Sequence, residues 1–122
     1  MTEKHEPGTV VFDPSAVAAL TGDVGDDAFA PVFVGKFRAL LPERVRRIAI
    51  TLGSDDVDDA LDAVLSLKVS ACAVGAGELC RIGRTLEAHL RHLDLAQARL
   101  VAVDLTAAAD RADAALGAYL AA

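Results

Sequence analysis

The sequence has very few aromatic residues. It contains four Phe, one Tyr and no Trp, so aromatics make up 4% of the 122 residues, whereas 53% of the residues are apolar. Alanine and leucine fill most of the apolar stretches, and this bias favours helices packed on helices over a sheet. No alternation of apolar and polar residues is long enough to predict a strand. We therefore expect an all-α protein.

The chain also lacks an excess of positive charge and a long apolar run. Its formal net charge is −6, which argues against a general nucleic-acid binder, because such proteins need a basic face to displace counterions from phosphates. The apolar runs are short and interrupted by charged residues, so we expect no membrane span. The segment "MTEKHEPGTVVF" has no cationic start followed by a long apolar core, and we therefore expect no secretory signal and a cytoplasmic location.

Cysteine and histidine are scarce, and their spacing does not favour a metal site. Cys72 and Cys80 lie in apolar helical segments without the paired spacing of a zinc or redox motif, so we interpret them as small packing residues in a reducing compartment. His89 and His92 are three residues apart on neighbouring faces of a helix, and no carboxylate or cysteine completes a ligand set. We interpret them as surface or boundary residues, and we expect neither a metal nor another cofactor.

Proline, glycine and aspartate mark the ends of the first predicted helices. Asp13 is placed to cap a short first helix, with Pro14 at its first position and Gly22 as its stop. Asp26 or Asp27 is placed to cap a second helix. The sequence therefore predicts a short leading helix and a second helix that begins soon after it.

The second helix is long and closes at Gly53. Pro42 falls inside it and should bend the helix without ending it. Apolar residues at spacings of three and four give the stripe of an amphipathic helix, which comprises Phe29, Phe33, Phe37, Leu40, Leu41, Val45, Ile48 and Leu52.

Three further helices follow with very short connections. The third begins at Ser54 with an acidic first turn and stops at Gly75, the fourth follows it directly, and Asp94 caps the fifth. The expected inward positions are Val57, Ala60, Leu61, Val64, Leu67, Ala71 and Val74 in the third helix, Leu79, Ile82, Gly83, Leu86, Leu90 and Leu93 in the fourth, and Ala98, Val101, Leu105, Ala108, Ala112, Leu116 and Tyr119 in the fifth.

Short connections between long helices predict antiparallel neighbours. We therefore expect an up-and-down antiparallel four-helix bundle with a short additional N-terminal helix. Only residues 1–11 look untethered, as domain termini often are. The expected organisation is a flexible N-terminus over 1–11 and a single helical domain over 12–122.

One flank of the third helix carries a lysine among apolar neighbours. At about 100° per residue, Leu65, Lys68, Val69 and Cys72 lie to one side of the inward face centred on Val64. The stem of Lys68 can follow apolar surface while its ammonium reaches water. Such a patch is either covered by another helix or offered to a partner.

The stretch "VLSLKVSACAVGAGELCRIGRTLE" resembles the histidine-containing phosphotransfer (HPt) domains, four-helix bundles that relay phosphoryl groups to receiver domains in bacterial two-component signalling. Their third helix typically reads A-H-S-L-K-G-S-S, followed by L-G-A and then, on the fourth helix, by L, C and L-E. The resemblance covers about residues 10–120. The residues in step with the family pattern are Ser66, Leu67, Lys68, Ser70, Gly75, Ala76, Leu79, Cys80, Leu86 and Glu87.

The sequence departs from the family pattern at the position of the phospho-accepting residue. Leu65 stands where the family places its phospho-accepting histidine, and Val69 stands where it usually places a glycine that lets the receiver approach. Leucine has no nitrogen to accept a phosphoryl group. The resemblance therefore implies a degenerate, non-catalytic HPt domain that binds a receiver domain or a hybrid histidine kinase through Leu65, Lys68, Val69 and Cys72.

Two other functions stay open. The chain could transfer phosphate through another histidine, or with Leu65 as a substitution of a native histidine, or it could be a structural or oligomerisation bundle. Lys68 is either a phosphate-stabilising group, as in the family, or a solubilising lysine. Arginines on the second and fourth helices either steer an acidic receiver or form a solvated face. A docking role for Leu65 requires that its side chain be at least partly exposed.

Overall fold

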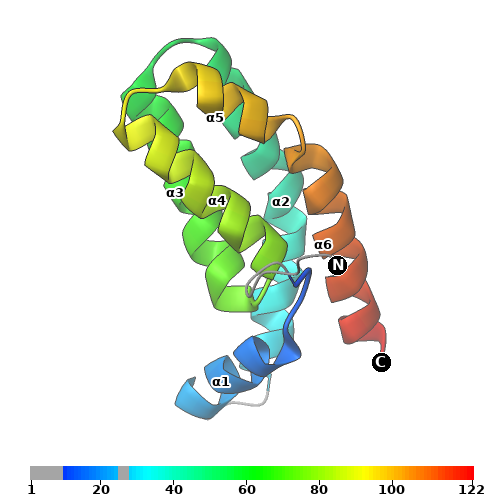
Figure 1. Cartoon of the computed structure of the whole chain (residues 1–122). Coiled ribbons are helices and arrows are strands. Elements are labelled where there is room, and N and C mark those ends of the chain that lie inside the picture. Colours follow the sequence, from blue (N-terminus) through cyan, green and yellow to red (C-terminus); the bar gives the residue numbers. More distant parts are fainter. Residues whose placement is uncertain (1–9, 25–27) are drawn as a thin grey trace, which may run out of the picture.

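The computed structural model describes residues 10–24 and 28–122, and all regular structure within them is helical (Figure 1). The all-α prediction is thereby confirmed. The helices are α1 (Pro14–Val24), α2 (Phe29–Gly53), α3 (Val57–Val74), α4 (Gly77–Arg91), α5 (Leu95–Ala102) and α6 (Leu105–Ala121).

The long helices form the predicted bundle. In Figure 1, α3 and α4 lie side by side as a hairpin, α2 runs behind them, and α6 runs beside α2. The short α1 lies at one end of the bundle, and α5 crosses the opposite end. No helix in the described part of the chain combines the length and the apolar character that crossing a membrane requires.

The last predicted helix is broken in two, which corrects the expectation of one helix after Asp94. The break falls between Ala102, the end of α5, and Leu105, the start of α6. Arg99 explains where α5 lies, because its Nε donates to the carbonyl of Leu52 at 2.8 Å and its guanidinium pairs with Asp55. These contacts hold α5 across the end of α2, so the chain must turn before α6 can run along the bundle.

Several helix ends agree with the predicted signals. The carboxylate of Asp13 accepts hydrogen bonds from the backbone N–H and the hydroxyl of Ser15 at the start of α1. Asp94 caps α5 by accepting from the N–H of Gln97 at 3.1 Å. Gly75 ends α3 with φ of 83°, a left-handed conformation that glycine adopts at little cost.

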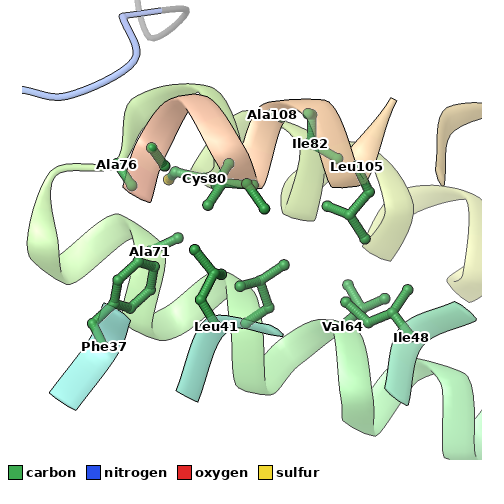
Figure 2. Close-up of a cluster of buried hydrophobic side chains, with 14 of the residues drawn as sticks. Phe37, Leu41, Ile48, Val64, Ala71, Ala76, Cys80, Ile82, Leu105 and Ala108 are labelled. Atoms are coloured by element: carbon green, nitrogen blue, oxygen red, sulfur yellow. The ribbon is translucent and has the colours of Figure 1, made fainter. Parts of the chain in front are cut away.

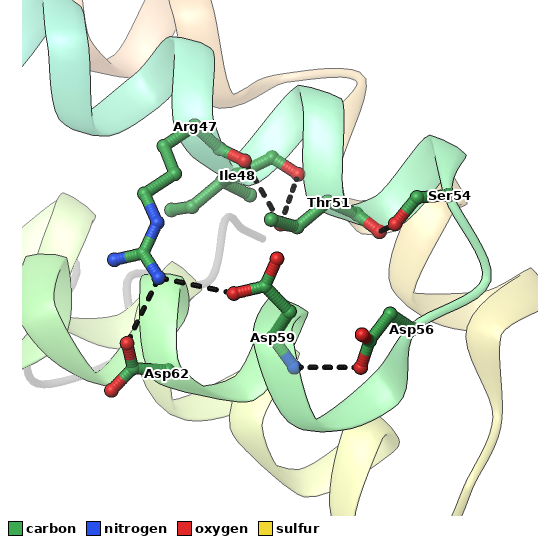
Figure 3. Close-up of polar contacts among 7 residues, drawn as sticks. All are labelled: Arg47, Ile48, Thr51, Ser54, Asp56, Asp59 and Asp62. Carbon is green, nitrogen blue, oxygen red and sulfur yellow. Dashed lines mark hydrogen bonds and ion pairs between the residues drawn. The ribbon is translucent and has the colours of Figure 1, made fainter.

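Other ends differ from the prediction. The cap of α3 is Asp56, not Ser54, and its side chain accepts from the N–H of Asp59 (Figure 3). Ser54 instead donates its hydroxyl to the carbonyl of Thr51, so it completes the end of α2. The first helix extends past Gly22 to Val24. The predicted caps at 26 and 27, and residues 1–9 of the predicted loose N-terminus, lie outside the described residues.

Ion pairs connect the C-terminal half of α2 to the first turns of α3. Arg47 on α2 donates to Asp59 at 3.2 Å and to Asp62 at 2.9 Å, both on α3 (Figure 3). Their hydrogen bonds raise the pKa of the Arg47 guanidinium, Asp62 having the larger effect. Pro42 lies inside α2, which continues through it to Gly53, as predicted.

The core is built mainly from leucine, valine and alanine of all the helices (Figure 2). Most predicted inward positions are buried, but Leu40 is 47% exposed and Leu93 is 75% exposed. Leu93 lies beyond the end of α4 with φ of 58°, so the chain has already left the helical path that the stripe assumed. The other predicted inward side chains that are only partly buried are Phe29, Phe33, Val45, Val57, Leu61, Val101 and Tyr119.

Candidate functional site

The predicted functional residues lie on the α3–α4 hairpin, whose turn is centred on Gly75. The N–H of Ala76 donates to the carbonyl of Ala71 at 2.9 Å, which closes the end of α3. The carbonyl of Gly75 accepts from the N–H of Asp13 at 2.8 Å, and a side chain at Gly75 would collide with the backbone carbonyl of Asp13. The turn therefore requires glycine and also holds the start of α1.

Helices α3 and α4 approach closely at Gly83. A Cβ atom at this position would lie 2.8 Å from the Cβ of Lys68, well inside normal contact. Because Gly83 has no side chain, the Lys68 stem packs directly against α4. The close contact sets where the Lys68 ammonium can reach.

The Lys68 ammonium is paired with a carboxylate, a partner that the sequence did not indicate. Its Nζ donates to Glu87 Oε1 at 2.7 Å, and the two side chains are only 23% and 18% exposed. The other oxygen of Glu87 accepts from Arg91 Nε at 2.8 Å. The hydrogen bond from Lys68 and then that from Arg91 hold the pKa of the Glu87 carboxyl below its ordinary value of 4.5. The lysine is thus one end of a three-residue ion network.

Leu65 and Val69 lie at the surface of α3. Leu65 is partly exposed, which confirms the requirement stated for a docking role, and Val69 is 62% exposed. Together with Lys68 and Cys72 they follow one flank of the helix at spacings of three and four residues. We name these four residues the α3 patch. Neither Leu65 nor Val69 offers an atom that could accept a phosphoryl group.

The two cysteines form a disulfide, so the expectation of two unpaired packing residues is wrong. Cys72 lies in the last turn of α3 and Cys80 in the first turn of α4, and their Cα atoms are 4.8 Å apart. That separation lies within the range a disulfide spans. The turn at Gly75 brings the two together, a geometry that a spacing of eight residues does not signal by itself.

The two histidines are placed away from the α3 patch. At 100° per residue, His89 lies on the opposite side of α4 from Glu87, which faces α3. His92 follows the end of α4, where its Nδ1 lies 2.8 Å from the carbonyl of Ala88. Within residues 10–24 and 28–122, no group of three or more His, Cys, Asp or Glu is placed to hold a metal ion.

Sequence reasoning did not identify the partners of the patch residues. Glu87 fell in step with the family pattern, but its bond to Lys68 spans 19 residues of sequence. Arg84 is exposed on α4, directly after Gly83, and has no ion-pair partner in the described part of the chain. Its place near the patch follows from the contact of Gly83 with Lys68, which the sequence alone does not signal.

A second feature lies between α2 and α6. There a groove of about 630 Å³ is lined by apolar side chains such as Leu41, Val45 and Ala109. Arg38 on α2 and Asp113 on α6 pair at its edge at 2.8 Å. None of the α3 patch residues lines this groove.

Comparisons with known proteins identify the fold. No protein-family model and no curated protein sequence matches the chain. The structure is similar to histidine-containing phosphotransfer protein B from Pseudomonas aeruginosa PAO1, with a TM-score of 0.78 and 20% identity over 90% of this chain and 94% of that one. It is also similar to the HPt domain of a sensor hybrid histidine kinase from Shewanella, with a TM-score of 0.76 and 19% identity over 91% and 94%. The chain therefore has the fold of these HPt proteins.

Proposed function

We propose that this chain is a degenerate HPt domain of bacterial two-component signalling, which binds a receiver domain or a histidine kinase module without accepting phosphate at Leu65. The observation that carries the proposal is that Leu65 is partly exposed and Val69 is exposed on α3 of an HPt-like fold. By the resemblance, these are the positions of the phospho-accepting histidine and of the glycine beside it. The cytoplasm, where such partners operate, is the proposed location.

The surface around Leu65 suits an apolar contact with a charged rim. Val69 supplies exposed apolar area, and Arg84 and Arg91 lie on the neighbouring α4. An interface with an apolar centre and a polar rim is typical of protein partners. Cations such as Arg84, which has no ion-pair partner among residues 10–24 and 28–122, would speed the approach of a partner with an acidic surface.

The same surface is poorly equipped for phosphoryl transfer. Leu65 cannot form a bond to phosphorus through its side chain, and Val69 places a branched side chain beside it. The Lys68 ammonium is held by Glu87, so its charge is already compensated. A phosphoryl group at this place would have to compete with a carboxylate for the lysine.

Binding is tested by two matched substitutions to aspartate. Leu65→Asp places a charge at the N-terminal end of the α3 patch, and Val103→Asp places one at an exposed apolar position of the α5–α6 turn. Purified receiver domains from the same organism are titrated by calorimetry. We expect Leu65→Asp to weaken binding by about tenfold or more, since a charge replaces an apolar side chain at the acceptor-equivalent position of the proposed interface. Val103→Asp should leave the affinity unchanged.

Phosphotransfer is tested with a radiolabelled phosphorylated receiver. The wild-type chain should take up no label, whereas the double variant Leu65→His and Val69→Gly should take up acid-labile label. Leu100→His, which places a histidine on exposed α5, is the control and should stay unlabelled.

Each alternative function has its own outcome. Labelled wild type that loses its label in His89→Gln or His92→Gln would establish a displaced acceptor and contradict the degenerate domain. Failure of both the wild type and the double variant to bind any receiver or kinase module would favour a structural or oligomerisation bundle.

A further inference from the structure

We propose that the Cys72–Cys80 disulfide is a reversible thiol-exchange site, opened by a thiol reductant that attacks the sulfur of Cys72. This proposal goes beyond the proposed binding of a receiver and does not depend on it. It rests on the different surroundings of the two sulfurs at the α3–α4 turn.

Access distinguishes the two cysteines. Cys72 is partly exposed on the flank of α3, whereas Cys80 is only 7% exposed and packs among the buried side chains of the core (Figure 2). A thiolate must approach one sulfur in line with the bond that breaks. The accessible target is therefore Cys72, and the sulfur that leaves is that of Cys80.

The charges around the turn favour the same direction. Cys80 lies in the first turn of α4, where the positive end of the helix dipole stabilises a thiolate, whereas Cys72 lies in the last turn of α3, at the negative end. Arg84 lies one turn after Cys80 without an ion-pair partner in the described ranges. Glu78, the acid in the first turn of α4, is already paired with Arg111 at 2.7 Å.

The exchange balances with a dithiol as the reductant. Its first thiolate attacks Cys72 Sγ, the disulfide breaks, and Cys80 leaves as the thiolate while a mixed disulfide forms on Cys72. The second thiol of the reductant then attacks its own bonded sulfur, which releases Cys72 as a thiolate. The reductant is oxidised to its disulfide, and its two protons end on the two cysteines.

Reducing the Cys72–Cys80 disulfide is expected to loosen the turn between α3 and α4 more than the contacts further along the two helices. The Lys68–Glu87 pair and the close contact at Gly83 lie further along the helices and do not depend on the disulfide. The turn contains Gly75, whose carbonyl holds the N–H of Asp13. Backbone amides of residues 73–79 and the start of α1 are therefore expected to exchange hydrogen faster in the reduced protein.

The test maps the sulfur that a monothiol attacks. Folded, oxidised protein is treated with excess glutathione, free thiols are blocked with N-ethylmaleimide, and peptides are analysed by mass spectrometry. We expect about tenfold more glutathione on Cys72 than on Cys80, because Cys72 is the more exposed of the two. Glutathione mainly on Cys80, or opening only after denaturation, would overturn the proposal, as would an intact mass without a disulfide.

Two pairs of matched variants test the proposal without relying on one substitution that could disturb folding. Cys80→Ser leaves the more exposed cysteine and should react with oxidised glutathione about tenfold faster than Cys72→Ser, because access outweighs the higher thiolate fraction expected at the start of α4. Each variant is checked for helicity by circular dichroism. Arg84→Gln should slow opening of the wild-type disulfide several-fold, whereas Arg44→Gln, which removes an arginine of α2, should not. Equal rates for the two arginine variants would contradict Cys80 as the leaving thiolate.

Discussion

The α3–α4 pair is held together tightly, whereas the α2–α6 pair leaves a groove between its helices. Between α3 and α4 the structure has a glycine contact, a disulfide and the Lys68–Glu87 network. Between α2 and α6 it has a groove of about 630 Å³ with the Arg38–Asp113 pair at its edge. The difference shows that the α3 patch lies on the more tightly fixed side of the bundle. Under the proposed function, this gives a partner a surface of defined shape.

The largest expected effect comes from removing the disulfide. The double variant Cys72→Ala and Cys80→Ala frees a link between residues that are eight apart, and loop-closure entropy predicts a loss of about 2–3 kcal/mol in the free energy of unfolding. Urea unfolding of the oxidised wild type and of the variant measures it. A loss as small as that caused by Asp113→Asn would mean that the α3–α4 side is not the more strongly fixed one.

The glycine contacts provide the next comparison. A methyl group at Gly83 meets the Cβ of Lys68, which cannot move away, whereas one at Gly117 on α6 meets the flexible guanidinium of Arg38. Gly83→Ala should therefore be less stable than Gly117→Ala by about 1–3 kcal/mol. Both variants gain the same helix propensity, so the difference in their urea midpoints isolates the contact. Equal midpoints would show that α3 and α4 can move apart freely.

The ion network at Glu87 should contribute more to stability than the Arg38–Asp113 pair, although the difference is smaller than for the glycine contacts. Glu87 accepts from both Lys68 and Arg91 and is 18% exposed. Asp113 accepts, among the described residues, only from Arg38 and is 45% exposed. We expect Glu87→Gln to cost about 1 kcal/mol or less, and Asp113→Asn to cost less than that. Thermal unfolding at low and high salt measures both, and a larger salt dependence for Glu87→Gln than for the wild type would contradict the network.

The smallest effect is a dependence on pH. The pKa of Glu87 is lowered in the folded protein by Lys68 and then by Arg91, so its contribution to stability is present above its ordinary pKa of 4.5. That contribution is lost as the pH falls through the lower folded value. The stability gap between the wild type and Glu87→Gln should therefore narrow from pH 6 to pH 3, as followed by urea unfolding. A stability difference between the wild type and Glu87→Gln that increases on acidification would contradict the lowered pKa of Glu87.

The features that could be predicted from the sequence are those set by neighbouring residues along the chain. The strongly periodic helices, the Asp94 cap and the stop at Gly75 follow from apolar spacing and from the preferences of single residues. The flank shared by Leu65 and Val69 follows from helical geometry. These features need no knowledge of how the helices pack.

The rest depends on contacts between distant parts of the chain. The break after Ala102 lies in an alanine-rich periodic stretch without glycine or proline, and it follows from the contact of Arg99 with Leu52. The partner of Lys68 and the disulfide both require the hairpin to exist first. Tertiary contacts of this kind leave no local signal.

The hydrogen bond from the N–H of Asp13 to the carbonyl of Gly75 fixes an order of assembly. Its acceptor is presented only when the chain at Gly75 has turned, whereas the hairpin around that turn consists of contacts close in sequence, which form early. Helix α1 should therefore dock late, so that truncating it raises the unfolding rate and leaves the folding rate nearly unchanged.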